Sequence, residues 1–589
     1  MKKQRIVLYS AMAVLAVAAG GGYTAWSMHK TTNTPQAAST APLVQTASPD
    51  GKKVPVSALV ANPPSGAHVQ SFTLTAQEKS ISLGGKTIQA MTFNGTVPGP
   101  LLQVRQGDLV EVTVRNQLRV PITVHWHGIP VPGSQDGVPG LTQEPIRPGE
   151  SHVYRFVADR AGTYWYHSHV NSVQEIGLGL YGGVVVLPKN QIAPAADRDY
   201  TLLLHEWSTT TSSSADETMG HTAGMSGMDM GSMGNMGGMD MGSPGGETHM
   251  NEMNGMNMGG AGGMNSMSSM SGMAGMPMGA PSLRTQGFQV TDMDWSALGE
   301  MAGMYDVYTV NQEAGGKTLL EAKPGETVRL RLVNAGNMTH LMTVIGTPFK
   351  VVAIDGRDIA NPTPIENQLL PMGAGQRYDI EFTMPKNGPV QLVSGDPEDR
   401  ARTQLRATIG DAAASGTGSA PDLPDVQHEP WFDFTRYGSG SIPGVQTFTL
   451  NQKFDKTFNM DLGVGMGQSG MVYTINGKAF PNVPPFVVNT GETVRIHIEN
   501  RSAYIHPMHL HGHSFQVLTR DGKPITGSPI FLDTLQVLPG ETYDIAFRAD
   551  NPGLWMFHCH DLHHASAGMD VVVQYAGVTD PYNPMDMSE

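Results

Sequence analysis

The sequence contains a single cysteine, Cys559, among 589 residues. The chain therefore cannot form an intramolecular disulfide, and Cys559 is either an inert core residue or a reactive or metal-binding one. Charged residues are also few, at 15%, and 52 acidic side chains outnumber 37 basic ones to give a net charge of −15. Because this charge repels a phosphate backbone, we do not expect nucleic-acid binding.

The N-terminus has the features of an export signal. The basic start MKKQR is followed by an apolar run from Ile6 to about Gly22, in which Ala16-Val17-Ala18 offers small residues for cleavage. An uncleaved anchor within residues 1–30 is the alternative, although cleavage is favoured. The positive-inside rule places the body of the protein outside the cytoplasm in both cases, in the periplasm or at the outer face of the membrane. Residues 31–65, rich in Thr, Ala, Pro and Ser, are predicted to form a flexible linker.

Alternating strand patterns follow a Gly-Asp or Gly-Glu turn at three places, in residues 101–115, 323–333 and 489–498. A period of two indicates half-buried strands, and the recurrence of one pattern indicates an internal repeat at domain scale. We therefore predict an all-β protein of three related β-sandwich domains. The predicted domains span residues 66–190, 196–410 and 426–577, with a linker at 411–425.

Methionine is unusually frequent, and residues 219–278 hold 18 of the 37 methionines. This segment lacks helical spacing and β-branched residues, so we predict a disordered insertion at 215–282 of the second domain. Thioether sulfur is soft and prefers Cu(I), which suggests Cu(I) recruitment, whereas the alternative is a low-complexity spacer. The candidate Cu(I) ligands are Met225, Met228, Met230, Met233, Met236, Met239 and Met241.

Twelve of the 21 histidines fall in four short clusters, and each cluster contains a His-x-His pair. Side chains at i and i+2 point to the same face of a strand, so each pair presents two imidazoles in one direction. Imidazole suits copper, zinc and iron, and eight imidazoles fit three metal ions with two, three and three ligands. Because two pairs come from each end of the chain, we expect the cluster where the first and third domains meet. The pairs are His125 and His127, His167 and His169, His509 and His511, and His558 and His560.

Cys559 lies between two of these histidines, so its sulfur is predicted to point to the opposite face of the strand. His564 follows five residues later and Met569 ten residues later. Two histidines, one cysteine and a weak axial methionine form the ligand set of a blue-copper electron-transfer site. We predict such a site, connected to the histidine cluster through the backbone of one residue. Its candidate ligands are His506, Cys559, His564 and Met569.

The motifs HWHG, YWYHSH, HPMHLHGH and HCHDLHHASAGM resemble those of the multicopper oxidases. These are three-domain cupredoxin proteins that include laccases, ascorbate oxidase and bacterial copper-resistance oxidases, and the resemblance covers residues 66–577. It implies one-electron oxidation of a reductant at a type 1 copper, electron transfer through the Cys559 segment, and reduction of O2 to two waters at the cluster. It implies four copper ions, with type 1 held by His506, Cys559, His564 and Met569, type 2 by His125 and His509, and the type 3 pair by His127, His167, His169, His511, His558 and His560.

Oxygen reduction also requires protons. Asp136 matches the acidic residue that the family places beside the cluster, which implies a proton relay, although Asp136 could instead cap its glycine-rich turn. Many bacterial members carry a glutamate directly after the type 1 histidine, where this chain has Ala565. Asp561 is the one residue that we can suggest as a second proton donor in place of that glutamate.

Four further histidines call for an interpretation. His513 is predicted to support or pack against the cluster, and His563 to lie in solvent near the type 1 edge. His340 occupies the second domain's counterpart of the metal position, but no Cys-x4-His pattern accompanies it, so we predict a metal-free domain. His205, on an apolar strand, is predicted to be a hydrogen-bonded core residue.

Four functions remain open at this point. The favoured one is an exported enzyme that oxidises Cu(I) with O2 in copper tolerance and also accepts phenols and dyes. The second is a laccase-like phenol oxidase, and the third is a copper-sequestering protein. The complete ligand set argues against the third, since storage requires no connected thiol. Fe(II) oxidation stays open, although no acidic cluster identifies an iron site. The expected partners are O2 and small reductants, with a monomeric chain and no membrane contact beyond the N-terminal anchor.

Overall fold

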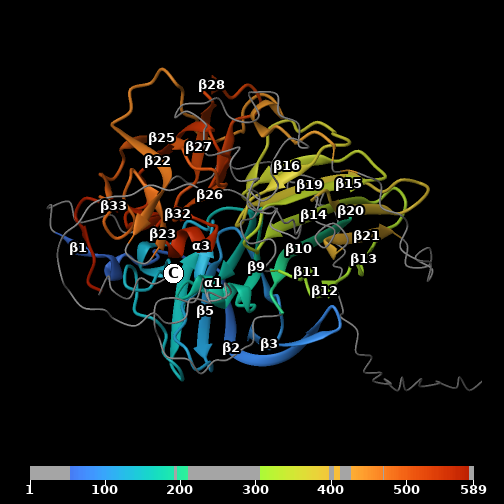
Figure 1. Cartoon of the computed structure of the whole chain (residues 1–589), viewed down its shortest axis with the longest axis horizontal. Helices are drawn as coiled ribbons and strands as arrows, with labels where there is room; N and C mark the ends of the chain where they lie inside the picture. The colour runs from blue at the N-terminus through green and yellow to red at the C-terminus, as the bar shows by residue number, and fades with distance from the viewer. Residues whose placement is uncertain are drawn as a thin grey trace, which may run out of the picture. The chain divides into compact units, whose positions relative to one another are not determined.

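A computed structural model of the chain is almost entirely β-structure, which confirms the predicted all-β class (Figure 1). It describes residues 53–190, 196–209, 305–396, 404–410, 426, 428–467 and 470–582. The N-terminal signal or anchor, the methionine-rich insertion and the linker at 411–425 lie outside these residues. The described α-helices are short, α1 (Ser172–Gly177) and α3 (Leu562–Ser566), and no described helix has the length and apolar character needed to span a membrane.

The first β-sandwich packs two four-stranded sheets against each other. Its strands are β2 (Val69–Leu83), β3 (Lys86–Phe93), β4 (Gly99–Arg105), β5 (Leu109–Asn116), β6 (His125–His127), β7 (Ser151–Val157), β8 (Gly162–His167) and β9 (Tyr181–Leu187). One sheet has the order β3-β2-β5-β7 and the other the order β4-β9-β8-β6. Apolar side chains from both sheets, such as Val112 and Val184, form its buried core.

The second sandwich combines a seven-stranded and a five-stranded sheet. Its strands are β10 (Arg198–Trp207), β11 (Val307–Val310), β12 (Glu313–Ala314), β13 (Thr318–Glu321), β14 (Thr327–Asn334), β15 (His340–Ile345), β16 (Lys350–Ile354), β17 (Arg357–Asp358), β18 (Leu370–Met372), β19 (Arg377–Thr383), β20 (Val390–Ser394) and β21 (Arg406–Gly410). The larger sheet has the order β12-β11-β10-β14-β19-β16-β17, and the smaller one the order β13-β21-β20-β15-β18.

The third sandwich has the same two-sheet plan and follows a short 3-10 helix, η7 (Phe434–Arg436). Its strands are β22 (Lys456–Gly467), β23 (Gly470–Ile475), β24 (Phe486–Val488), β25 (Thr493–Asn500), β26 (His506–Leu510), β27 (Phe515–Arg520), β28 (Lys523–Pro524), β29 (Ile530–Leu532), β30 (Thr534–Val537), β31 (Thr542–Arg548), β32 (Leu554–Cys559) and β33 (Asp570–Tyr575). One sheet has the order β23-β22-β25-β31-β27-β28, with β29 on β27, and the other the order β24-β33-β32-β26-β30.

One strand arrangement recurs in all three sandwiches, which confirms the repeat predicted from the glycine–acid turns. The strands β5, β14 and β25 each pair in parallel with β2, β10 and β22, respectively, and antiparallel with β7, β19 and β31. The turn before each of them holds a glycine at positive φ: Gly107 at 94°, Gly325 at 85° and Gly491 at 90°. Because this conformation disfavours a Cβ, the turn chemistry accounts for the repeated glycine.

Residues 54–59 are ordered parts of the fold, so the flexible-linker prediction for 31–65 is wrong in its last part. β1 (Val54–Pro55) pairs in parallel with β34 (Val578–Thr579), and the adjoining 3-10 helix η1 (Val56–Ala58) precedes Leu59. Val56 and Leu59 are buried in the core, and the Leu59 carbonyl accepts a hydrogen bond from Ser134 in the 3-10 helix η2 (Gly133–Gln135). The apolar spacing of these few residues was hidden by the average composition of the segment.

Candidate metal centres

Two antiparallel strand pairs position the four His-x-His motifs: one motif lies within β6, and the other three extend one or two residues beyond the ends of β8, β26 and β32. In the first sandwich β6 pairs with β8 and sets His125 opposite His167. In the third sandwich β26 pairs with β32 and sets His509 opposite His558. All eight histidines of the motifs have exposed fractions of 1% or less. The strands therefore present their imidazoles to the protein interior, where solvent does not compete for the ring nitrogens.

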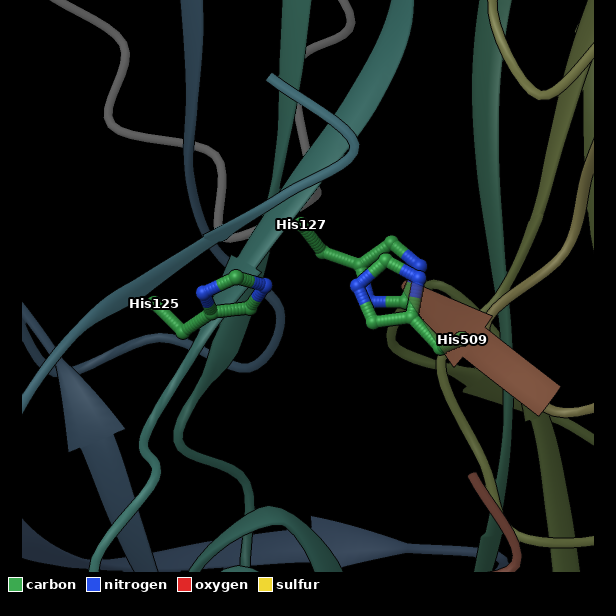
Figure 2. A group of neighbouring side chains, drawn as sticks. All are labelled: His125, His127 and His509. Atoms are coloured by element: carbon green, nitrogen blue, oxygen red, sulfur yellow. The ribbon is translucent and has the colours of Figure 1, made fainter. Parts of the chain in front are cut away.

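The structure brings all eight predicted histidines into one cluster, with members from the first and third sandwiches. Within each of three groups, one ring nitrogen per residue lies within 4.8 Å of the others. Figure 2 shows the group at the boundary of the two sandwiches, in which the His127 and His509 rings stack with centroids 3.7 Å apart. The groups are His125, His127 and His509; His127, His167 and His560; and His169, His511 and His558.

Hydrogen bonds to the outward ring nitrogens fix the orientation of these imidazoles. The Nδ1 atoms of His125 and His509 donate to the main-chain carbonyls of Asp136 and Asp533, at 2.9 and 3.0 Å. His127 is turned the other way, since its Nε2 lies 3.1 Å from the Thr534 hydroxyl. A neutral imidazole that donates from one nitrogen keeps a lone pair on the other. Each ring is thus left with one inward nitrogen that can bind a metal.

The inward nitrogens provide a test of whether this site fits metal ions. His125 Nε2, His127 Nδ1 and His509 Nε2 are buried and have no hydrogen-bond partner among the described residues. Buried polar atoms are almost always hydrogen-bonded, so several unpartnered nitrogens that face one another require an explanation. Copper bound by imidazole would satisfy all of them, and the site therefore fits the predicted metal cluster.

The protonation of the cluster also suits metal binding. Burial, supported by repulsion from neighbouring imidazoles, holds the pKa of most members well below the usual histidine range and lowers that of His169 to about 3. The other members so affected are His127, His167, His511, His558 and His560. Because a metal-ligating histidine must be neutral, this environment prepares the rings for metal at neutral pH.

A second group of side chains lies around the single cysteine. The Cys559 sulfur is 3.7 Å from His506 Nδ1 and 3.6 Å from His564 Nδ1, and those two nitrogens are 3.1 Å apart. All three side chains are buried. The buried Met569 joins the same turn, because its main-chain carbonyl accepts from the Cys559 N–H and its N–H donates to the His564 carbonyl, both at 3.1 Å. The arrangement has the thiolate, two imidazoles and nearby methionine of a blue-copper site.

Asp136 lies within the histidine cluster. Its Oδ2 accepts a hydrogen bond from His511 Nδ1 at 2.9 Å, and its Oδ1 lies 3.2 Å from His125 Nδ1. The carboxylate is fully buried and directly follows η2, which Leu59 anchors. Asp136 thus connects a histidine of the first sandwich with one of the third, where a carboxylate can orient both rings and exchange protons.

Comparison with known proteins identifies the family of this chain. Family profiles described as multicopper oxidase match residues 75–191, 198–391 and 443–577, which together make up more than half of the chain. The chain belongs to the multicopper oxidase family. Members of this family are copper-dependent oxidoreductases with O2 as the electron acceptor, and so is this protein.

Several relatives match this multicopper oxidase over most of their own length. Multicopper oxidase MmcO of Mycobacterium tuberculosis is 29% identical over 87% of this chain and 88% of that protein. Copper resistance protein A of Escherichia coli is 24% identical over 85% of this chain and 91% of that protein. Among solved structures, a multi-copper oxidase from Pseudomonas thermotolerans is 25% identical, with a TM-score of 0.57, and covers 87% of this chain and all of its own. A laccase from Botrytis aclada, 22% identical with a TM-score of 0.60, shares the fold over 89% of this chain and 91% of its own.

The remaining candidates from the sequence fall into two places in this multicopper oxidase. Asp561 caps α3, and its Oδ2 lies 3.5 Å from His564 Nε2, so it lies at the cysteine group rather than at the histidine cluster. His513 bonds to the His511 carbonyl and to the Tyr575 hydroxyl, a position that supports the cluster from outside. Met225 and the other candidate methionines lie outside the described residues.

His340 is buried in the second sandwich between two carboxylates. Its Nδ1 lies 3.3 Å from Asp396 and its Nε2 3.5 Å from Glu206. Burial alone would lower the pKa of His340, but these two acids outweigh it and raise the pKa to about 9. A protonated imidazole has no free lone pair for a metal. Among the described residues of this sandwich, no group of histidine, cysteine or acidic side chains has metal-binding geometry.

A small pocket beside α3 is a feature that the sequence did not indicate. It is lined by His205 and Glu206 of β10, by Tyr305 and Asn337, and by Leu562 and His563 of α3. His205 donates from Nδ1 to the Ala335 carbonyl, as expected of a core histidine. The pocket adjoins the cysteine group through Asn337, whose side-chain N–H donates to Asp561 at 3.2 Å. No local motif could have predicted it, because its lining comes from five separate parts of the chain, α1 included.

Proposed function

We propose that this multicopper oxidase oxidises Cu(I) to Cu(II) with O2, outside the cytoplasm and in copper tolerance, and that it oxidises phenols and dyes less efficiently. The observation that carries the choice of donor is the Glu206 carboxylate in the pocket beside α3, one oxygen of which has no hydrogen-bond partner among the described residues. A carboxylate oxygen next to the electron-accepting site favours a small cation over a neutral aromatic molecule. The names of two relatives, copper resistance proteins A of Escherichia coli and of Pseudomonas syringae, are consistent with this role.

The acidic side chain of the pocket is Glu206, which is 1% exposed and has the protonated His340 3.5 Å from one of its carboxylate oxygens. One carboxylate oxygen accepts the N–H of Asn337 at 3.0 Å and also binds the N–H of Met338, whereas the other has no hydrogen-bond partner among the described residues. Burial opposes ionisation, but His340 and these hydrogen bonds outweigh it and lower the pKa of Glu206. The carboxylate is therefore ionised at neutral pH and offers one oxygen to a cation.

A short chain of contacts connects this pocket to the cysteine group. Asn337 lines the pocket and donates to Asp561 Oδ1, while Asp561 Oδ2 lies 3.5 Å from His564 Nε2. The side-chain oxygen of Asn337 also accepts the Leu562 N–H at 2.7 Å and fixes the start of α3. Only the side chains of Asn337 and Asp561 would separate a donor in the pocket from His564. This short separation supports electron entry from the pocket.

Thr209 precedes and Tyr305 follows the part of the chain that contains the methionine-rich segment. The described chain ends after Thr209, two residues beyond β10, and begins again at Tyr305, which lines the pocket. Thr209 N donates to Asp306 at 2.7 Å, so the two borders are held together. This supports the hypothesis that the methionines of residues 219–278 collect Cu(I) for the oxidase.

We further infer that the chain holds four copper ions. His506, Cys559, His564 and Met569 would hold type 1, His125 and His509 type 2, and the remaining six histidines the type 3 pair. Bound copper would supply the one-electron steps and the centre at which O2 is reduced to two waters. The grouping of the six into two sets of three, one with His127 and one with His169, supports this division.

The protein's own residues have three tasks in this scheme. Cys559 joins the two centres, because the residues on both sides of it, His558 and His560, belong to the cluster. The buried strands exclude water from the imidazoles, and the main-chain carbonyls described above fix their tautomers. Asp136, whose carboxylate contacts His511 and His125, is placed to pass a proton to the cluster, where reduction of O2 to water consumes four protons.

Replacing Glu206 with glutamine should weaken the use of Cu(I) selectively. Loss of the buried charge is expected to raise the KM for Cu(I) about tenfold, which corresponds to about 1.4 kcal/mol of lost attraction. The KM for a neutral phenol should stay the same or fall. Steady-state O2 uptake with each donor measures both values.

Two further variants separate charge at the pocket from other causes. Glu206→Asp keeps the charge and should keep the low KM for Cu(I). Glu321→Gln removes one negative charge from an exposed position on β13 and should change the KM for neither donor. An unchanged KM for Cu(I) in Glu206→Gln would show that this pocket does not receive the donor, and laccase-like phenol oxidation would then become the better description.

A further inference from the structure

Arg377, at the start of β19 in the second sandwich, reaches the copper-binding region of the other two sandwiches. It is fully buried. Its guanidinium makes two parallel hydrogen bonds with the Asp533 carboxylate of the third sandwich, each 2.6 Å long. Its Nε donates to the Thr163 carbonyl of the first sandwich at 3.2 Å. One side chain of the domain without predicted copper therefore joins the two domains that form the cluster.

Asp533 and the next residue, Thr534, contact two of the candidate copper ligands directly. The Thr534 hydroxyl donates its single hydrogen to Asp533 Oδ1 at 2.9 Å. Its oxygen then accepts from His127 Nε2 at 3.1 Å, and His509 Nδ1, also 3.1 Å away, shares its single hydrogen between this oxygen and the Asp533 carbonyl. These bonds place the ring hydrogens on the outward nitrogens. They leave His127 Nδ1 and His509 Nε2 as the nitrogens that face the cluster.

A second residue of the same sandwich, Asp355, holds the main chain of this pair. Its Oδ2 accepts the N–H groups of Asp533 and Thr534 at 3.2 and 3.0 Å, while Oδ1 accepts the Arg377 N–H at 3.0 Å. The second sandwich thus binds both the side chain of Asp533 and the backbone that carries it. The two parallel hydrogen bonds between Arg377 and Asp533 define the direction of the Asp533 carboxylate as well as its distance.

The packing around the guanidinium leaves it little freedom to move. Gly128 follows His127 at a φ of 83°, and a Cβ at this position would lie 2.3 Å from Arg377 Nη2. Gly375 lies two residues before the arginine, at a φ of 84°. It packs against the cluster, since a Cβ at this position would lie 2.8 Å from His127 Cε1. Both glycines allow the second sandwich to approach the His127 ring closely.

We propose that Arg377 is a positioning residue for the type 2 and type 3 copper ligands, acting through Asp533 and Thr534 on His509 and His127. The inference rests on the proposed copper assignment, in which His125 and His509 hold the type 2 ion. It gives the second sandwich a role beyond connecting the other two. Without Arg377, the Asp533 carboxylate, which orients His509 and His127 together with Thr534, is no longer held in place.

The test compares Arg377→Met and Arg377→Lys with the wild type in the copper-loaded full-length protein. The measurements are the type 2 electron paramagnetic resonance signal, the copper content after dialysis, the blue absorption and O2 uptake. In Arg377→Met we expect loss of the type 2 signal and an O2 uptake about 10- to 100-fold lower, with the blue absorption retained. Arg377→Lys should be intermediate, because an ammonium keeps the charge but not the two-pronged geometry.

Arg331→Met is the matched control. Arg331 is 5% exposed, lies in the same sheet, pairs with Asp379 and Asp199, and donates to the Thr163 hydroxyl. None of these three partners is a candidate copper ligand, so this variant should lose thermal stability yet keep the type 2 signal. Equal loss of that signal in Arg331→Met would reduce Arg377 to a general packing residue and overturn the proposal.

Two other outcomes would also decide whether Arg377 positions the copper ligands. If Arg377→Met does not fold, Thr534→Val removes the hydroxyl that contacts both rings and should show the same selective loss of the type 2 signal. A wild-type signal in Thr534→Val or in folded Arg377→Met would overturn the positioning role. A wild-type protein with no type 2 signal would contradict the copper assignment itself, and with it this role for Arg377.

Discussion

Replacing Cys559 with serine will remove the blue absorption and lower the oxidase activity by about a thousandfold or more. The sulfur lies within 3.7 Å of a ring nitrogen of His506 and of His564, and the colour of the proposed type 1 site would arise from a copper–thiolate bond that an alcohol oxygen does not form. The same residue is the covalent link between His558 and His560. Its loss therefore affects both the centre that accepts electrons and their path to the cluster.

The third sandwich should remain folded in Cys559→Ser. The main-chain bonds between Cys559 and Met569 do not involve the side chain, and a serine hydroxyl can donate to one of the nearby imidazoles, so we expect destabilisation of about 1–2 kcal/mol. Thermal unfolding and the visible spectrum measure the two effects separately. Met556→Leu, buried three residues earlier in β32, is the control and should stay blue and active. A blue and active Cys559→Ser protein would refute the type 1 assignment.

His125→Ala will have the opposite pattern, with the blue absorption retained and O2 uptake reduced by about a hundredfold or more. His125 is far from the cysteine group in sequence and joins the cluster with His127 and His509. Its removal takes one of the two proposed type 2 ligands. Electrons should still reach the type 1 centre from a donor, but they would no longer be passed on to O2.

A stopped-flow measurement distinguishes these two stages in His125→Ala. Anaerobic addition of a donor should bleach the blue colour at the wild-type rate, and admission of O2 should fail to restore it promptly. His152→Ala is the control, because His152 is a half-buried histidine of the first sandwich that belongs to no candidate metal group. Wild-type O2 uptake in His125→Ala would contradict the type 2 assignment.

The fold was predictable to a large extent because its signals are local. The glycine of each Gly-Asp or Gly-Glu turn adopts positive φ, as at Gly107, and the alternating residues that follow form β5 and its counterparts. The linker prediction failed at Val56 and Leu59 for a related reason. A composition average over 31–65 does not detect a few spaced apolar residues that pack onto a distant strand.

The candidate ligands were predictable because their spacing carries the chemistry. A His-x-His pair in a strand points two rings the same way. The spacing alone therefore identified the four pairs that the structure brings together. The supporting residues lack such a signal. Asp533 and Arg377 are 156 residues apart, and neither stands in a recognisable motif. Glu206 likewise acquires its role only when β10, Asn337 and α3 meet. Residues that act across domain boundaries thus require the folded chain for their identification.

The most direct test of the account is the choice of electron donor by the copper-loaded full-length protein. We would measure kcat/KM by O2 uptake for Cu(I), supplied as a stable complex, and for a simple phenol, and repeat both after deletion of residues 219–278. The account predicts a value for Cu(I) at least about tenfold above that for the phenol, and a deletion that lowers only the Cu(I) value. A full-length protein that prefers the phenol, with Cu(I) oxidation unaffected by the deletion, would contradict the proposed cuprous oxidase activity and identify a laccase.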